Sequence, residues 1–122
     1  MSAAGAFSWN SELPSGRNPF WIRDEGLAGL GLHVGDAVSV DTRIEPGSGD
    51  LVVVEVELED DSLRTARRYV PLPNGQVRLE PVGAATEVEP LELPAERVMV
   101  MGVIAARLRL QPDGTPVEQP IP

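Results

Sequence analysis

The stretch Gly35–Leu58, GDAVSVDTRIEPGSGDLVVVEVEL, determines the fold that this sequence predicts. It contains two Gly-Asp pairs, 14 residues apart, and each pair precedes a valine-rich segment. The second segment is apolar and β-branched at first and then alternates with glutamates, as in a strand that begins buried on both faces and ends with one face in water. The Pro, Gly and Ser residues between the two segments indicate a turn. We therefore expect two adjacent strands here.

Further strand patterns lie on both sides of this stretch. The glycine-rich segment Asp24–Gly35 leaves room only for a short helical turn. An Asn-Gly pair at Asn74 predicts a tight hairpin. The other strands that we expect are Phe20–Arg23, Arg64–Val70, Val77–Pro81, Val88–Leu93 as an edge strand because of Pro90, and Val98–Leu110. The sequence thus predicts an all-β fold with little or no helix, in which small twisted sheets form an irregular β-barrel or sandwich.

The chain of 122 residues is long enough for one domain with its own core. We expect three parts: a flexible N-terminal arm over residues 1–18, a β domain over residues 19–110, and a disordered tail over residues 111–122. The tail is expected to be disordered because it is rich in proline and poor in apolar residues.

Composition excludes several classes of function. The net charge is −9, which disfavours direct binding to nucleic acid. The chain has no cysteine, a single histidine and no lysine, so we expect no metal, no cofactor and no lysine-based catalysis. No apolar run approaches the ~20 residues that span a bilayer. The N-terminus does not read as a signal peptide, so a cytoplasmic location without membrane contact is expected.

The order of several short motifs points to one protein family. These motifs are Phe20–Arg23, Gly26–Gly29, Gly35-Asp36, Gly49-Asp50, Thr65–Arg68, Val77–Pro81, Thr86–Pro90 and Gly102–Ile104. Their order resembles the C-terminal domain of the LexA and UmuD family of self-cleaving bacterial proteins, whose core signal peptidases share. The resemblance covers about Asn18 to Leu110. It implies a serine nucleophile in the turn before the first Gly-Asp pair and a lysine base on the strand after the second.

Both positions of this serine–lysine dyad differ in the present chain. Ala28 stands where the family carries its serine, and Arg67 stands where it carries its lysine. Alanine has no nucleophile, and arginine does not release its proton near neutral pH. The nearest hydroxyls, Ser39 and Thr42, follow the first Gly-Asp pair instead of preceding it. The resemblance therefore implies a pseudo-peptidase that has kept the fold and lost the chemistry.

A domain of this kind would act as a protein-interaction module, in bacterial regulation or the DNA-damage response. The positions that we expect to line its peptide-binding cleft are Gly26, Leu27, Gly29, Arg67 and Arg68. For the two arginines, cross-strand pairing with Glu55, Glu57 or Glu59 is the favoured interpretation.

The resemblance also implies a homodimer, in addition to another protein as partner. Val98–Leu110 is the longest apolar run, and one small domain cannot easily bury both faces of so long a strand. The side chains that we expect in the dimer interface are Met99, Met101, Val103, Ile104 and Leu108.

Two alternatives remain open at this point. One is a hydrolase with a displaced active site built on Asp36 or Asp50, although both positions are better explained as strand starts and turns. The other is an unrelated small β-barrel that binds a partner. Ala4-Gly5 resembles the Ala-Gly bond at which LexA cuts itself, but an arm of small residues is the favoured interpretation.

Overall fold

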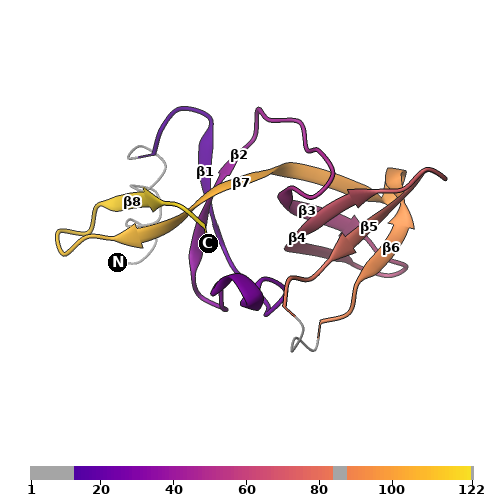
Figure 1. The fold of residues 1–122 in the computed structure, drawn as a ribbon, viewed down its shortest axis with the longest axis horizontal. Helices are drawn as coiled ribbons and strands as arrows, with labels where there is room; N and C mark the ends of the chain where they lie inside the picture. Colours follow the sequence, from indigo (N-terminus) through magenta and orange to yellow (C-terminus); the bar gives the residue numbers. More distant parts are fainter. Residues whose placement is uncertain (1–12, 84–87, 122) are drawn as a thin grey trace.

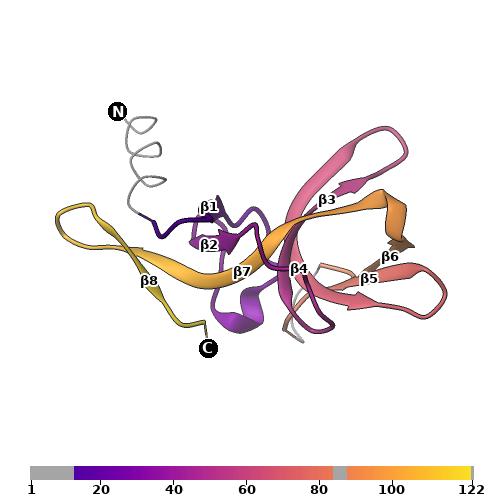
Figure 2. The same cartoon turned by 90° about the horizontal axis from the view of Figure 1, so that it is seen from above.

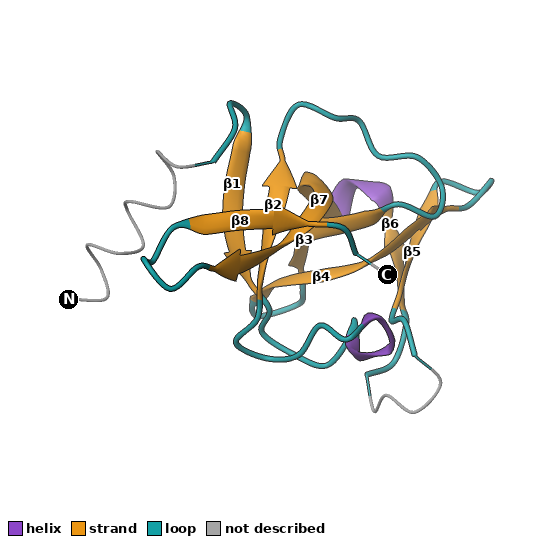
Figure 3. Ribbon diagram, turned by 60° about the vertical axis from the view of Figure 1, so that its left-hand side comes forward, coloured by secondary structure: helices purple, strands orange, loops and turns teal. Residues whose placement is uncertain are grey.

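The computed structural model describes residues 13–83 and 88–121, and these residues form one antiparallel sheet with two short 3-10 helices (Figures 1 and 3). The elements are β1 Arg17–Trp21, η1 Ala28–Leu30, β2 Ala37–Asp41, β3 Leu51–Glu57, β4 Ser62–Pro71, β5 Gln76–Glu80, β6 Leu91–Pro94, η2 Ala95–Arg97, β7 Val98–Leu110 and β8 Pro116–Gln119. The prediction of an all-β fold with little helix is confirmed. Within the described ranges, no helix has the length and apolar character needed to cross a membrane.

The sheet is organised around β7. The strand order is β1-β2-β7-β3-β4-β5-β6, with β8 beside β7, and the sheet does not close into a barrel. β7 runs along the whole domain and bends as it passes from β3 to β2 (Figure 2). Two register shifts lie along it, one opposite Val53–Val54 and one opposite Ser39–Val40. Such bulges bend a strand, so one long strand can serve two differently oriented parts of the sheet.

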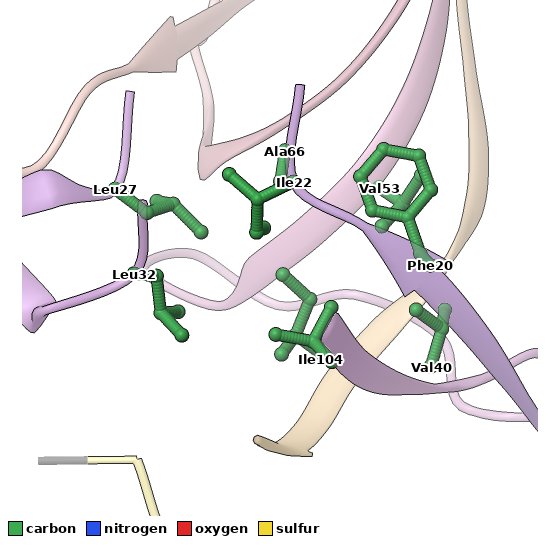
Figure 4. Close-up of a cluster of buried hydrophobic side chains, with 9 residues drawn as sticks. Phe20, Ile22, Leu27, Leu32, Val40, Val53, Ala66 and Ile104 are labelled. Atoms are coloured by element: carbon green, nitrogen blue, oxygen red, sulfur yellow. The ribbon is translucent and has the colours of Figure 1, made fainter. Parts of the chain in front are cut away.

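β3 separates the two main clusters of buried side chains. Its residue Val53 packs into the first cluster, and its neighbours Val52 and Val54 pack into the second. The first cluster consists of Phe20, Ile22, Leu27, Leu32, Val38, Val40, Val53, Ala66 and Ile104 (Figure 4). The second consists of Val52, Val54, Val56, Val77 and Leu79. The expectation that this strand begins buried on both faces is confirmed.

The prediction of a disordered tail over residues 111–122 is wrong. Pro116–Gln119 forms β8 and pairs with the last four residues of β7. The connecting turn is closed by two hydrogen bonds between Gln111 and its partners Thr115 and Gly114. Proline removes only one backbone donor and is tolerated on an edge strand, so the proline content did not exclude this strand.

The boundary of the N-terminal arm also differs from the prediction. β1 begins at Arg17, inside the segment expected to be flexible, and Leu13 is buried against Ala37 and Leu108. The domain therefore begins before residue 19. Residues 1–12, which include Ala4-Gly5, and residues 84–87, which include part of the Thr86–Pro90 motif, lie outside the described residues.

Candidate functional site

The turn that carries Ala28 follows β1 and is fixed against the segment that comes after β5. Gly29 donates its N–H to the carbonyl of Val82 at 2.8 Å, and the Val82 N–H donates to the carbonyl of Gly26 at 2.7 Å. A Cβ atom on Gly29 would lie 2.6 Å from the Cα atom of Gly83. Only glycine therefore fits at position 29, and the close approach of the two segments sets the position of the turn.

Leu27 and Leu32 anchor the turn to the core from its two ends. Both side chains are fully buried and face Ile22 and Ile104 in the first cluster (Figure 4). Gly31 has a φ of 76°, which allows the chain to reverse between them. The short helical turn expected near Gly26–Leu30 is present as η1.

Arg67 on β4 is buried beneath this turn, with a side-chain exposure of only 3%. Its Nη1 atom donates to Asp24 Oδ1 at 2.8 Å, to Thr65 Oγ1 at 2.9 Å and to the carbonyl oxygen of Ala66 at 2.7 Å. Its Nη2 atom donates to Asp24 Oδ2 at 3.0 Å. The guanidinium thus makes a two-point ion pair with Asp24, the strongest geometry for such a pair.

Asp24 completes a small polar cluster, which we call the Arg67–Asp24 cluster and which consists of Asp24, Gly26, Thr65 and Arg67. The Gly26 N–H donates to Asp24 Oδ1 at 2.9 Å, and the Thr65 hydroxyl donates to Asp24 Oδ2 at 2.8 Å. Burial is the largest single effect on the pKa of Asp24 and raises it. The hydrogen bonds from Arg67, Gly26 and Thr65 together outweigh burial, so the pKa lies below its usual value of 3.8.

Gly26 is the point at which the turn and Arg67 touch. A Cβ atom on Gly26 would lie 2.1 Å from Arg67 Nη1, so the guanidinium fills the space beside the glycine backbone. The structure therefore brings the Gly26–Gly29 turn into contact with Arg67. The Nε–H group of Arg67 is fully buried and donates to no acceptor among the residues that the structure describes.

The favoured pairing of Arg67 with Glu55, Glu57 or Glu59 is wrong, because Arg67 pairs with Asp24 instead. Glu55 is engaged by Arg64, with 2.6 Å between Arg64 Nη2 and Glu55 Oε1. Arg68 is half-buried and contributes no contact to the Arg67–Asp24 cluster, since successive side chains on a strand point to opposite faces. Asp24 was missed because its contact with Arg67 spans 43 positions and leaves no local pattern.

A groove of about 210 Å³, separate from the cluster, opens between β1, β2, the start of β4 and the bulged part of β7. Its apolar lining is Pro19, Phe20, Val40, Val53 and Met101, and its polar lining is Asn18, Thr42 and Arg64. Pockets for small-molecule ligands usually enclose about 300–1,000 Å³. The groove is therefore too small for a typical metabolite and is suited to one large apolar side chain of a partner.

The side chains expected in a dimer interface lie in different environments. Ile104 and Leu108 are buried in the chain's own core, with exposures of 7% each, so neither can contact a partner in the folded chain. Val103 is half-buried against the second cluster, and Met101 lines the groove. Met99 is 60% exposed and is the one member of this set that lies fully on the surface.

The carboxylates considered for a displaced active site each stabilise a local turn. Asp36 Oδ2 accepts the N–H of His33 at 2.9 Å, and Asp50 Oδ2 accepts the N–H of Gly47 at 2.7 Å. His33 is exposed and lies 2.9 Å from Glu25, between Nδ1 and Oε1. Over residues 13–83 and 88–121, no three His, Cys, Asp or Glu side chains are grouped in a way that could hold a metal ion.

Comparison with models of known protein families and with curated proteins found no match to this chain. The resemblance to the LexA and UmuD family therefore rests on the order of the sequence motifs alone.

Proposed function

We propose that this chain is a catalytically inactive LexA/UmuD-like domain that acts as a protein-interaction module, in bacterial regulation or the DNA-damage response. The observation that carries the proposal is the Arg67–Asp24 cluster. A buried arginine, held by a carboxylate whose pKa is lowered, stands where the family mechanism needs a neutral lysine. A guanidinium remains protonated at any pH compatible with folding and cannot act as that base.

The groove lined by Phe20, Val53 and Met101 supports the binding part of the proposal. An apolar floor with a polar rim fits an extended segment of another protein that inserts one large side chain. Hydrolysis at Asp36 or Asp50 is the weaker alternative, because both carboxylates are engaged by the backbone of their own turns. An unrelated β-domain that binds a partner through the same groove would share this binding chemistry, and comparison with an experimental backbone of the family would separate the two.

Self-cleavage should be absent under conditions that activate the family. Alkaline pH deprotonates a lysine base, but Arg67 stays charged and Ala28 offers no nucleophile. We expect mass spectrometry after prolonged incubation at about pH 10 to show an intact chain. Cleavage at Ala4-Gly5 that persists in repurified protein and in the presence of protease inhibitors would contradict the proposal.

The double variant Ala28→Ser/Arg67→Lys should remain nearly inactive in the same assay. It tests whether the loss of the two functional groups is by itself the reason for the absence of self-cleavage. Asp24 would pair with the new lysine and keep it protonated, and the pocket that desolvates the family's lysine would be absent. Misplacement of a reacting group by about 1 Å costs on the order of 100-fold in rate. Efficient self-cleavage of this variant would show that the site has stayed preorganised.

Binding through the groove can be tested by selecting peptides from a displayed random library on the folded protein. We expect the selected peptides to share one large apolar residue in an extended segment. Met101→Arg fills the groove and should weaken binding at least about tenfold, because a charged side chain would replace the apolar floor. Met99→Arg introduces the same charge outside the groove and should leave binding unchanged. Equal loss in both variants would assign binding to another surface.

The proposed homodimer would form through exposed apolar side chains near the two ends of β7. Met99 and Leu110, near opposite ends of the strand, are exposed by 60% and 56% and each adds apolar surface at its end of the domain. A two-fold related copy is the commonest cover for such a surface.

A further inference from the structure

β8 pairs with one edge of β7, near the C-terminal end of β7. β2 and β8 both pair with Arg107 and Leu108, so they lie on opposite edges of β7. β3 pairs with the other half of β7 on the edge that β8 continues. The last two strands form a hairpin that projects from one end of the domain (Figures 1 and 2).

The segment around β8 is attached by three side chains. Pro116 is buried, Ile121 packs against the first core cluster, and Glu118 enters a polar site formed by β1 and β2. Only four residues pair with β7, and the turn over Gln111–Gly114 is exposed. β8 is a four-residue strand that pairs only with β7, so this end of the chain is expected to open more readily than the central strands.

The site that receives Glu118 is specific for a carboxylate. Arg17 Nη1 donates to Glu118 Oε2 at 2.7 Å, and the Ser39 hydroxyl donates to the same oxygen. Ser39 is fully buried, and Glu118 is the acceptor that the structure gives its hydroxyl. The register places Ala37, Ser39 and Ala106 on the face that Glu118 crosses, and their small side chains leave room for it. An empty site would leave a buried hydroxyl without an acceptor.

The charges around the site are balanced only when this carboxylate is present. Asp41 is held by Arg17 Nε at 3.0 Å and by the backbone N–H of Arg43 at 2.9 Å. Hydrogen bonds from the Arg43 side chain, from the Arg43 backbone N–H and from Arg17, in decreasing order of effect, lower the pKa of Asp41 to about 2. Asp41 therefore stays ionised and holds Arg17 by its Nε atom. The Nη1 atom of Arg17 is then free to donate to Glu118.

We propose that this site is filled in trans, by β8 of a second copy of the same chain. Exchange of identical elements between two copies re-forms every contact of the closed chain, including the pair of Glu118 with Arg17 and Ser39. Only the turn over residues 111–115 changes, with the loss of its two hydrogen bonds. Leu110, which is 56% exposed, adjoins this turn. The inference deepens the dimer part of the proposed function by naming the element that joins the copies.

Cysteine cross-linking provides the test, because the chain has no cysteine of its own. Arg109 and Val117 lie directly opposite each other in the ladder, where Cα atoms are about 5.5 Å apart, within the range that a disulfide bridges. Arg109→Cys and Val117→Cys are placed in two separately tagged full-length chains and mixed at high concentration under mild oxidation. We expect a disulfide-linked heterodimer, at least about tenfold above the level from Arg109→Cys mixed with Glu92→Cys. Glu92 is exposed on β6 and reports random collision.

Two further variants complete the design. Adding Glu118→Ala to the Val117→Cys chain should reduce the heterodimer toward the control level, because the carboxylate is removed. Both cysteines in one chain should form an internal disulfide in dilute solution, which verifies the register. Internal bridging together with only background heterodimer would overturn the exchange, as would the absence of internal bridging in folded protein. A wild type that is dimeric by light scattering without this cross-link would keep the dimer and remove only the exchange.

Discussion

Ile104→Asp is expected to abolish folding, not to separate a dimer. Ile104 is 7% exposed and packs with Phe20, Leu32 and Val40 in the first core cluster. The substitution removes a buried side chain and places a carboxylate without a partner in apolar surroundings. We expect a loss of about 5 kcal/mol or more, which is comparable to the whole stability of many domains. Circular dichroism and the urea midpoint would measure it.

Met99→Asp is the matched control for this prediction and also tests the dimer. Met99 lies on the same strand but is 60% exposed, so the folded state should lose no more than about 0.5 kcal/mol. If β7 contributes its exposed end to an interface, this variant should be folded and monomeric by light scattering. A folded Ile104→Asp variant would contradict the placement of Ile104 in the core.

Asp24→Ala is expected to cause the next largest loss. It leaves the guanidinium of Arg67 buried without its carboxylate, and removal of one partner from a buried pair costs about 3–5 kcal/mol. The loss should fall near the lower end, about 3 kcal/mol, since the Asp24 side chain is 31% exposed. Glu25→Ala removes the neighbouring, exposed carboxylate, which is bonded to exposed His33 and to the N–H of Val34, and should change the unfolding free energy far less than Asp24→Ala does. Equal effects of the two variants would contradict the buried pair.

The contribution of Asp24 should also depend on pH in a defined direction. Its pKa is lowered in the folded state from 3.8. A group of this kind stabilises the fold above its unfolded pKa, and the contribution is lost as pH falls through the lower folded value. The wild type should therefore lose stability more steeply than Asp24→Ala as pH is lowered below about 4. Urea unfolding at several pH values would measure the two slopes.

Much of the fold could be predicted because periodicity and turn chemistry are local. The apolar run Val98–Leu110 corresponds residue for residue to β7, and the Asn-Gly pair lies in the hairpin between β4 and β5. β8 was missed because its strand pattern is only four residues long and begins with proline, so its stability depends on contacts with Arg17 and Ser39. Such contacts form between distant parts of the chain and leave no mark in the local sequence.

The candidate site could be predicted only in part for the same reason. The resemblance placed the Gly26–Gly29 turn and Arg67 together, and both are found at one site. It did not predict Asp24 as the partner of Arg67. Arg68 lies outside the cluster because neighbouring side chains on β4 point to opposite faces of the sheet. Burial of Ile104 and Leu108 was missed because an apolar run on a strand does not reveal which residues the chain covers itself.

The coupling between Asp24 and Arg67 tests the central structural claim most directly, namely that a buried ion pair joins β4 to the turn after β1. Arg67→Met replaces the guanidinium by an apolar side chain, and Asp24 keeps the hydrogen bonds from Gly26 and Thr65. A double-mutant cycle over Asp24→Ala, Arg67→Met and the double variant should give a coupling energy of about 2 kcal/mol. The double variant should be more stable than Asp24→Ala alone. Additive losses, with coupling below about 0.5 kcal/mol, would contradict the account.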